Sequence, residues 1–281
     1  MNVVETVDAM AALADDFRCR ALRIGLVPTM GYLHAGHVSL MKESLSRCDV
    51  TVVSIFVNPV QFGPNEDFSR YPRDLERDCR LCREAGVDVV FCPSADEMYA
   101  PDRSVSVVEQ ALSSGLCGAS RPGHFSGVCT VVAKLFNIVR PAVAVFGQKD
   151  AQQLAVIRRM VRDLNYRLEI IGAPIVREAD GLAMSSRNIY LSGMEREQAL
   201  GLNRVLLLAV QAVRDGQVDA GSLRVAMGDF LRRGYPGVDV EYITFADADT
   251  LVLRESVVPG TLLAVAARVG RTRLIDNVLL M

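Results

Sequence analysis

The chain has 281 residues, of which 50% are hydrophobic and 23% are charged, and 31 Lys and Arg against 33 Asp and Glu give a formal net charge of −2. This composition excludes a mostly disordered chain, and the length predicts one large domain plus one smaller domain. Without a basic run, nucleic acid is not expected as a partner. No apolar run approaches the roughly 20 residues needed to span a bilayer, and the first 15 residues lack a cationic start followed by an apolar segment. We therefore expect no membrane association and a cytoplasmic location.

The seven cysteines are an odd number spread through core-forming sequence, unlike a disulfide framework. Cys79 and Cys82 form one C-x-x-C, but no second pair or nearby histidine completes a zinc site. We interpret all seven as reduced thiols that pack.

Through the first two-thirds of the chain, short apolar runs alternate with segments of helical length. The runs at residues 23–27, 50–57, 87–91, 142–146 and 167–171 predict buried parallel strands. The segments at residues 37–47, 75–85, 128–139 and 152–163 predict crossover helices. The expected fold is α/β, with a doubly wound, Rossmann-like parallel sheet. Ligands of such sheets bind outside the carboxyl ends of the strands, so the loops after Val27, Val57 and Phe146 are expected to carry the site.

After Pro174 the pattern changes. A polar loop through residue 188 precedes two predicted helices, at 194–214 and 222–233, and three strand-like runs, at 238–246, 261–268 and 273–280. This order predicts a small α+β domain. We place the larger, ligand-binding domain at residues 1–175 and the smaller lid domain at residues 176–281.

The first segment with chemistry runs from residue 26 to residue 37 and leads from the first strand into a helix. Glycines at 31 and 36 permit close backbone approach, and the start of a helix attracts anions. His34 and His37, three residues apart, can face the same anion, donate hydrogen bonds to it and add positive charge if protonated. The alternative is two ordinary histidines at a helix start, but the strand, glycine-rich turn and helix favour phosphate binding.

The spacing His34-x-Gly36-His37 resembles the HIGH motif of the nucleotidyltransferase superfamily, which includes class I aminoacyl-tRNA synthetases and enzymes that make adenylates. The sequence has neither a Walker motif nor a G-x-G-x-x-G dinucleotide fingerprint. A P-loop kinase and a Rossmann dehydrogenase are therefore disfavoured.

The second segment, residues 54–63, carries two amides, Asn58 and Gln61, after an apolar strand. Gln61 can donate to a carboxylate and accept from a hydroxyl, which would hold a hydroxy acid without neutralising a carboxylate needed as nucleophile. For this segment alone, amides that merely cap a loop are an equal alternative.

The third segment, residues 146–153, again leads from a strand end into a helix. The ammonium of Lys149 can neutralise charge that spreads over a pentavalent α-phosphate, and Gln153, one turn onward, would point toward the same cleft. A surface salt bridge is the alternative for Lys149.

The fourth segment, residues 176–188, lies at the proposed domain boundary and resembles the KMSKS loop of the same superfamily in position and polarity, with Arg187 in place of a lysine. Its hydroxyls and guanidinium can close over a polyphosphate. A solvated linker containing Gly181 is the alternative. In a further glycine-containing loop, Arg121 and His124 can bind an anion or the substrate, or serve a structural role, about equally.

In this order the four segments resemble the pantothenate synthetase, or pantoate–β-alanine ligase, family. The matching stretches are Pro28-Thr-Met-Gly with His34 and His37, Ser54-Ile-Phe-Val-Asn-Pro with Gln61-Phe, Gly147 with Lys149-Asp150 and Gln153-Leu, Ser185-Ser-Arg-Asn, and Thr272-Arg-Leu-Ile-Asp276-Asn. Two departures are Gln148, where the family often has Glu, and Tyr32, where a smaller residue is common.

The resemblance implies that ATP and (R)-pantoate give pantoyl-adenylate and pyrophosphate, after which β-alanine attacks the acyl carbon and releases AMP. Mg²⁺ would accompany ATP. His37 would be the catalytic proton donor, with His34 and Lys149 assisting at the phosphates. Gln61 and Gln153 would hold pantoate, and Gln61 would also contact β-alanine. A homodimer through the larger domain is also implied.

By family analogy, one set of residues would hold the nucleotide: Met30, Gly31, Tyr32, Leu33, His34, Ala35, Gly36, His37, Gly147, Gln148, Lys149, Asp150, Val176, Met184, Ser185, Ser186 and Arg187. The substrate-binding candidates besides Gln61 and Gln153 are Asn58, Arg121 and His124. No protein ligand of Mg²⁺ is assigned, since Asp78, Asp150 and Asp180 are all conceivable and Mg²⁺ often relies on substrate phosphates and water.

Two other readings stay open. A related nucleotidyltransferase would transfer AMP or CMP to a phosphorylated small molecule and keep the nucleotide in its product. A nucleotide-sensing or RNA-binding module would have kept only the fold, although the charge balance argues against RNA.

Overall fold

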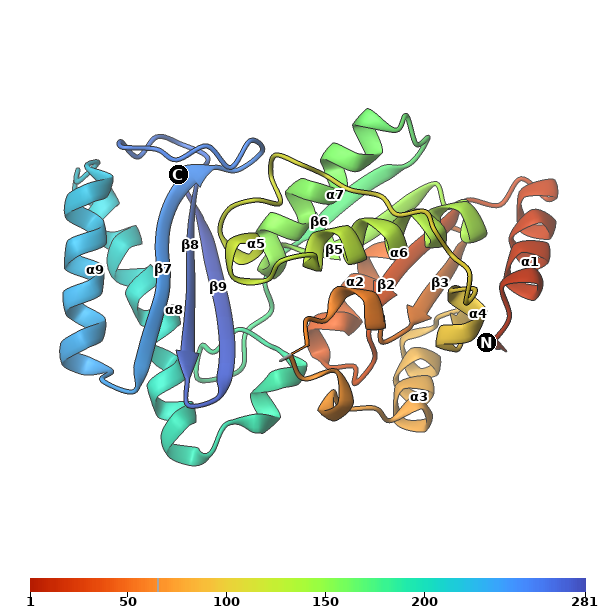
Figure 1. Ribbon diagram of the computed structural model, residues 1–281, viewed down its shortest axis with the longest axis horizontal. Coiled ribbons are helices and arrows are strands. Elements are labelled where there is room, and N and C mark those ends of the chain that lie inside the picture. Colours follow the sequence, from red (N-terminus) through yellow and green to blue (C-terminus); the bar gives the residue numbers. More distant parts are fainter. Residues whose placement is uncertain (65) are drawn as a thin grey trace. The chain divides into compact units, whose positions relative to one another are not determined.

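The computed structural model describes residues 1–64 and 66–281 and groups them into two compact units (Figure 1). Unit 1 comprises Met1–Gln148 and Val156–Pro174, and unit 2 comprises Lys149–Ala155 and Ile175–Met281. Unit 1 is built on a parallel sheet covered by helices, and unit 2 on a small antiparallel sheet with two helices. The predicted fold class is confirmed.

Unit 1 contains a six-stranded sheet in the order β1-β4-β3-β2-β5-β6, and every neighbouring pair is parallel. Its strands are β1 (Asn2–Val4), β2 (Ile24–Thr29), β3 (Val50–Ile55), β4 (Val89–Phe91), β5 (Val143–Gly147) and β6 (Glu169–Ala173). Its helices are α1 (Val7–Cys19), α2 (Ala35–Leu45), α3 (Leu75–Ala85), α4 (Ala95–Met98), α5 (Cys117–Ser120) and α6 (His124–Val139), with short 3-10 turns η1 (Pro59–Gln61) and η2 (Phe68–Arg70). The turn η3 (Gln148–Asp150) and helix α7 (Ala151–Asp163) connect β5 to β6.

The strands are apolar on both sides because helices cover both faces of the sheet. Helix α2 packs on β2, β3 and β5 and helps to bury Val27, Val53 and Val145, while α1 packs against α6 and β2. The side chains of Val27 and Val53 are 0% exposed. Helix α2 thus covers the central strands β2 and β5.

The strand order places the functional loops. The chain passes from β2 through α2 to β3 on one side of β2, whereas β5 lies on its other side and leads through α7 to β6. The carboxyl ends of β2 and β5 therefore flank the point at which the winding reverses, where ligands of such sheets bind.

Some elements of unit 1 were not predicted from the sequence or were predicted with different bounds. Strand β1 has three residues, which is too short for a recognisable apolar run, and among the described residues it pairs with β4 alone. Helix α6 begins at His124, four residues before the predicted start, because Gly123 (φ 80°) begins it where the apolar pattern is not yet visible. Short edge strands and helix ends depend on tertiary contacts more than on local pattern.

Unit 2 contains the antiparallel sheet β7-β8-β9, formed by β7 (Val238–Asp247), β8 (Thr261–Val269) and β9 (Thr272–Leu280). Helices α8 (Gly193–Arg214) and α9 (Ala220–Gly234) pack on it around a core that includes Leu202, Met227, Phe245 and Val265, and the turn η4 (Ser186–Tyr190) precedes α8. A shift of register between Val240 and Tyr242 explains the mixed alternation of β7 in the sequence.

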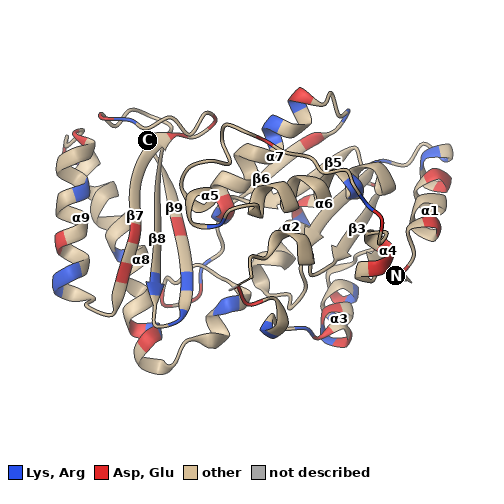
Figure 2. Cartoon of the chain, viewed as in Figure 1, with Lys and Arg blue, Asp and Glu red and all other residues tan. Residues whose placement is uncertain are grey.

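Within the described ranges, no helix is long and apolar enough to cross a membrane. Acidic and basic residues are interspersed along the helices (Figure 2). Among the described residues the cysteines form no disulfide, and burial raises the pKa of Cys82 to about 12 and the pKa of Cys92 and Cys129 to about 11. These three thiols therefore stay protonated at neutral pH.

Candidate active site

The loop after β2 has an unusual backbone that a buried carboxylate holds. Gly31 (φ 78°) and Tyr32 (φ 49°) are both in the left-handed region, which is unfavourable for a bulky residue such as Tyr32. The carboxylate of Asp78 on α3 accepts the N–H groups of Tyr32 and Leu33, each at 2.7 Å. The guanidinium of Arg77 lies 5.0 Å from the centre of the Tyr32 ring. Neighbouring α3 thus fixes the loop.

Asp78 is 1% exposed, and burial raises its pKa against the opposing effect of the two backbone N–H groups. A partly satisfied buried carboxylate would be costly, so the two short hydrogen bonds are what make its position tolerable. Because each of its oxygens accepts a loop N–H, Asp78 serves as a support for the loop.

The two imidazoles form a reciprocal cap at the start of α2. The N–H of Gly36 donates to His34 Nδ1 at 3.1 Å, and the N–H of His34 donates to His37 Nδ1 at 3.2 Å. The ring centres are 4.0 Å apart. Since both Nδ1 atoms accept, each neutral ring carries its proton on Nε2. A proton on Nδ1 would break these bonds, so the geometry favours neutral donors over the imidazolium form.

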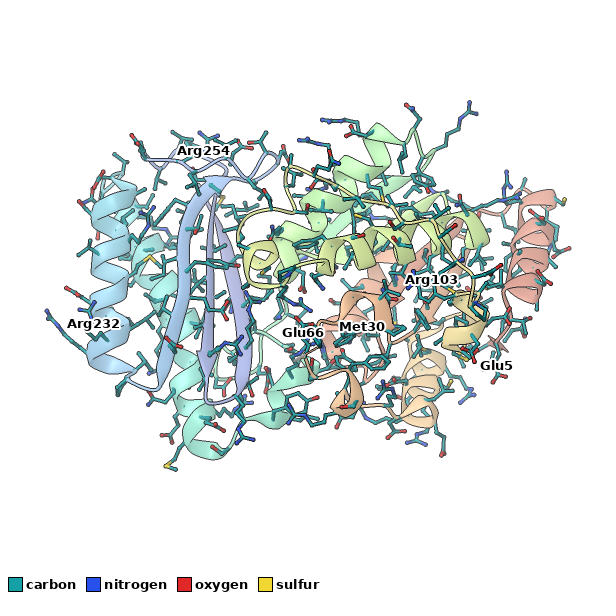
Figure 3. All side chains as sticks on the ribbon, in the orientation of Figure 1. Glu5, Met30, Glu66, Arg103, Arg232 and Arg254 are labelled. Atoms are coloured by element: carbon teal, nitrogen blue, oxygen red, sulfur yellow. The ribbon has the colours of Figure 1, made fainter. Side chains whose placement is uncertain are left out.

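The two amides of the second segment are brought together. Asn58 Nδ2 donates to Gln61 Oε1 at 3.0 Å, and Gln61 Nε2 donates to Met30 Sδ at 3.1 Å. Asn58 is 1% exposed and Gln61 is 8% exposed. The amide pair therefore adjoins the loop after β2 through Met30, which is labelled in Figure 3.

Helix α6 braces the backbone of Gln61. A Cβ at Gly127 would lie 2.6 Å from the Cα of Gln61, so only glycine allows this close approach. His124 Nδ1 lies 2.9 Å from the carbonyl oxygen of Gln61, and Arg121 Nη1 lies 2.9 Å from His124 Nε2. Because the guanidinium can only donate, His124 accepts at Nε2 and donates from Nδ1.

Arg121 is in turn held by Glu66, which is labelled in Figure 3, through two hydrogen bonds of 2.6 and 2.7 Å. Burial raises the pKa of Glu66, but the bonds and charge of Arg121 outweigh it and lower the pKa below its ordinary value. Arg121 and His124 thus reach Gln61 through its backbone, and their predicted contact with substrate stays a prediction.

The third segment follows β5. Gly147 ends the strand, and Gln148 Nε2 donates to the carbonyl oxygen of Gly172 at 3.3 Å. In unit 2, Asn277 Nδ2 on β9 donates to the carbonyl oxygen of Lys149 at 2.8 Å, although 128 residues separate the two in sequence. Asn277 is 6% exposed. A buried side chain of the C-terminal strand therefore fixes the backbone of Lys149.

The fourth segment is anchored at its first turn by an ion pair. Arg177 Nη1 and Nη2 donate to the two carboxylate oxygens of Asp276 at 2.6 and 2.9 Å, and Arg177 also donates to the carbonyl oxygen of Gly181. The side chain of Asp276 is 2% exposed. Met184 N–H donates to the carbonyl oxygen of Val176, which closes the loop on itself.

The far end of the segment is anchored separately. Asn188 Nδ2 donates to Glu178 Oε1 and to the carbonyl oxygen of Ala183. Arg196 on α8 binds Glu178 and Asp180 at 2.6 and 2.7 Å. The hydroxyl of Ser185 caps η4 by accepting the N–H of Arg187. Ser185 and Arg187 are half-buried between the two anchors.

A cage for a metal ion is absent from the described part of the chain, where no group of three or more His, Cys, Asp or Glu could hold one. Of the three acids considered from sequence, Asp78 binds loop N–H groups and Asp180 pairs with Arg196. The carboxylates of Asp78 and Asp180 are thus already engaged by N–H groups of the protein.

The predicted residues thus fall into two groups. Unit 1 brings together Met30, the paired histidines and the amide pair; unit 2 contains Lys149, Gln153 and the segment from Val176 to Arg187. Sequence reasoning missed Tyr99, whose hydroxyl donates to Asn58 Oδ1 at 2.8 Å, and the support given by Asp78 and Asn277. For Asn277 the sequence offered one signal, the family motif that contains Asp276 and Asn277. For Tyr99 and Asp78 it offered none, because the sequence cannot show which distant segment a buried polar side chain contacts.

Comparison with known proteins adds an independent line of evidence. A family model described as pantoate–β-alanine ligase matches residues 2–279. The pantothenate synthetase of Thermotoga neapolitana is 54% identical over 280 residues and both chains are fully covered; that of Geobacter sulfurreducens is 55% identical, with 100% of this chain and 99% of the relative covered.

Solved structures agree. The pantothenate synthetase of Thermus thermophilus has a TM-score of 0.93 and 46% identity, with 99% of each chain covered. A pantoate–β-alanine ligase of Francisella tularensis, complexed with beta-gamma ATP and β-alanine, has a TM-score of 0.81 and 33% identity, with 99% of this chain and 97% of that chain covered.

Proposed function

This chain belongs to the pantoate–β-alanine ligase family and joins pantoate to β-alanine, and we propose that it does so with ATP through a pantoyl-adenylate. A carboxylate is a poor acylating agent for an amine. Transfer of AMP to its oxygen creates a good leaving group, which makes adenylation the activating step.

In the first step, a carboxylate oxygen of (R)-pantoate attacks the α-phosphorus of ATP and pyrophosphate leaves. His37 and His34 donate from Nε2 to the phosphates as negative charge builds, and Lys149 supplies positive charge to the pentavalent α-phosphate. The capping bonds that hold both Nδ1 atoms support this assignment, because they aim a fixed donor without needing an imidazolium. The nucleotide-binding set is that named from sequence: residues 30–37, 147–150, Val176 and residues 184–187.

In the second step, the free amine of β-alanine attacks the acyl carbon and AMP leaves. Gln61 and Gln153 hold pantoate, and Gln61 also contacts β-alanine. Asn58, Arg121 and His124 also take part in binding the substrates, which is supported by their hydrogen bonds to the side chain of Gln61, to one another and to its backbone. Closure of the site keeps water from the mixed anhydride until the amine arrives.

Mg²⁺ enters as part of the MgATP substrate, coordinated by phosphates and water. We further propose that the enzyme acts in the cytoplasm as a homodimer through the larger domain, and that residues 1–175 and 176–281 are its two domains. The departures Gln148 and Tyr32 remove no group used in either step.

The single observation that carries the proposal is the reciprocal cap of His34 and His37, which presents two neutral N–H donors at the point where the sheet winding reverses. It is tested by exchange of labelled pyrophosphate into ATP. We expect exchange that requires pantoate but not β-alanine. Exchange without pantoate, or none until β-alanine is present, would contradict the adenylate pathway.

A second function, transfer of a nucleotidyl group to a phosphorylated small molecule, differs in its product. That enzyme would retain AMP or CMP in the product, whereas AMP is released free here. Chromatography of the products with labelled ATP separates the two.

A further inference from the structure

Four side chains of unit 1 form a chain of hydrogen bonds with a single direction. Tyr99, directly after α4, donates from its hydroxyl to Asn58 Oδ1 at 2.8 Å. Asn58 Nδ2 donates to Gln61 Oε1 at 3.0 Å, and Gln61 Nε2 donates to Met30 Sδ at 3.1 Å. Each hydrogen bond in this series is donated in the same direction, from the phenol of Tyr99 toward the loop after β2.

Main-chain groups fix this direction. The carbonyl oxygen of Gly127 accepts from Asn58 Nδ2 at 3.1 Å, and the N–H of Val60 donates to Asn58 Oδ1 at 3.4 Å. A carbonyl cannot donate and an N–H cannot accept, so the Asn58 amide has one orientation. Asn58 therefore turns its NH₂ group to Gln61. Gln61 must therefore accept this hydrogen bond with its side-chain oxygen, so its own NH₂ group points away from Asn58.

Tyr99 supplies the shorter of the two bonds to Asn58 Oδ1, since the contact with Val60 is long. Burial raises the pKa of Tyr99 to about 12, so its phenol remains a donor at neutral pH. The guanidinium of Arg103 lies 4.9 Å from the ring centre and the Phe56 ring lies 6.1 Å away, which keeps the phenol in place.

We propose that Tyr99 is a positioning residue for pantoate, which acts through Asn58 to make Gln61 present its NH₂ group, and not its carbonyl, to the substrate. This inference rests on the proposed role of Gln61. Met30 Sδ takes one of the two hydrogens on Gln61 Nε2, and within residues 1–64 and 66–281 no acceptor takes the second. The oxygens of a hydroxy acid supply that acceptor, whereas an ammonium or other pure donor does not.

The first test replaces Tyr99 by phenylalanine. Since the buried Asn58 Oδ1 loses its best donor, Tyr99→Phe is expected to raise the KM for pantoate about tenfold while the KM for ATP stays unchanged. Tyr166→Phe is the matched control: Tyr166 is a partly buried tyrosine of unit 1 that packs on Phe136 and bonds Asn137, and its loss should leave both constants unchanged. A normal pantoate KM in Tyr99→Phe would overturn the proposal.

A double-mutant cycle tests whether Tyr99 acts through Gln61. Gln61→Ala is expected to raise the pantoate KM, and adding Tyr99→Phe should then have no further effect. Additive effects would overturn the inference alone. If Gln61→Ala leaves the pantoate KM unchanged, the proposed role of Gln61 is wrong and the inference falls with it.

Asn58→Asp is a second test, which reverses the direction of the hydrogen bond between residue 58 and Gln61. A carboxylate oxygen in place of Nδ2 would face Gln61 Oε1 and the carbonyl oxygen of Gly127, so Gln61 must turn its NH₂ group inward. We expect the pantoate KM to rise about 100-fold, because Asn58 loses its NH₂ donor and Gln61 then presents its oxygen, an acceptor, to the substrate. Thermal unfolding of the variant checks that it is folded. Near-normal pantoate binding in the folded variant would contradict the polarity argument.

Discussion

The two candidate phosphate-binding segments are held in different ways. In the loop after β2, Asp78 accepts hydrogen bonds from two backbone N–H groups and the start of α2 fixes both imidazoles, so the side chains of the two histidines are themselves held. The segment from residue 176 to 188 is held at its ends, by Arg177 with Asp276 and by Asn188 with Glu178. The first arrangement suits donors that must be preorganised, and the second leaves the hydroxyls and Arg187 between two anchors.

The largest effect is expected at an anchor of the second segment. Asp276→Ala breaks a bidentate pair whose carboxylate is 2% exposed, and removal of one partner from such a pair costs about 3 kcal/mol or more of unfolding free energy. Urea unfolding measures it. Asp229→Ala, which breaks an exposed pair with Arg232, is the control and should cost less than about 1 kcal/mol. Equal losses in the two variants would show that the anchor is not needed.

The next effect separates capping from catalysis in the first segment. Asparagine is as good a helix cap as other polar residues, so His34→Asn should keep the unfolding temperature while removing the Nε2 donor. We expect pantoate-dependent pyrophosphate exchange to fall about 10²-fold, as when a preorganised donor is removed. Full exchange activity in a stable His34→Asn protein would mean that His34 only caps the helix.

A smaller effect is expected from the support beneath that loop. Asp78→Asn turns one acceptor of a loop N–H into a donor, which should cost about 2 kcal/mol of unfolding free energy and raise the KM for ATP about tenfold. Asp74→Asn, at the exposed N-cap of the same helix, preserves its cap and should change neither quantity. If Asp78→Asn lowers stability but leaves the KM for ATP unchanged, the loop does not need this carboxylate for nucleotide binding.

Asn277→Ala asks whether β9 positions Lys149. Loss of one hydrogen bond to the Lys149 carbonyl should slow pyrophosphate exchange about tenfold, and the change should have no further effect once Lys149→Ala has been made. Thr261→Val, a buried change on β8 of the same sheet, controls for stability. Additivity of Asn277→Ala with Lys149→Ala would exclude a positioning role.

The smallest effect is expected at an ion pair outside both segments, that of Glu66 with Arg121, which provides a reference for the two. The pKa of Glu66 in the folded protein lies below its ordinary value of 4.5, so the ionised form favours folding. Its contribution, about 1 kcal/mol, is complete above pH 4.5 and disappears as the pH falls through the lowered pKa. The unfolding free energies of the wild type and Glu66→Gln should therefore differ at pH 7 and converge below pH 4.5. A difference that does not narrow as the pH falls below 4.5 would contradict this origin.

The fold could be predicted largely from the sequence because valine-rich strands, crossover helices and glycine turns act locally. Helix α3 was predicted at its observed bounds, since Asp74 caps it and Gly86, with φ of 90°, ends it. The candidate residues could be named because loops at strand ends are contiguous in sequence.

The sequence could not predict which residues support the candidate site by hydrogen bonds from distant segments. Asp78 lies 46 residues from Tyr32, Tyr99 lies 41 from Asn58, and Asn277 lies 128 from Lys149. Each is a single polar residue in an ordinary helix, turn or strand, and its partner is determined only when distant elements pack. The polarity of an amide pair likewise depends on which main-chain groups surround it, which no local pattern encodes.

The central claim is that a carboxylate oxygen of pantoate becomes bonded to the α-phosphorus of ATP. Pantoate labelled with ¹⁸O in its carboxylate tests this most directly, with mass spectrometry of the products. We expect one ¹⁸O atom in each AMP released, because cleavage of the acyl-adenylate leaves the bridging oxygen on phosphorus. AMP without the label, or ¹⁸O in pyrophosphate or inorganic phosphate, would contradict the adenylate mechanism.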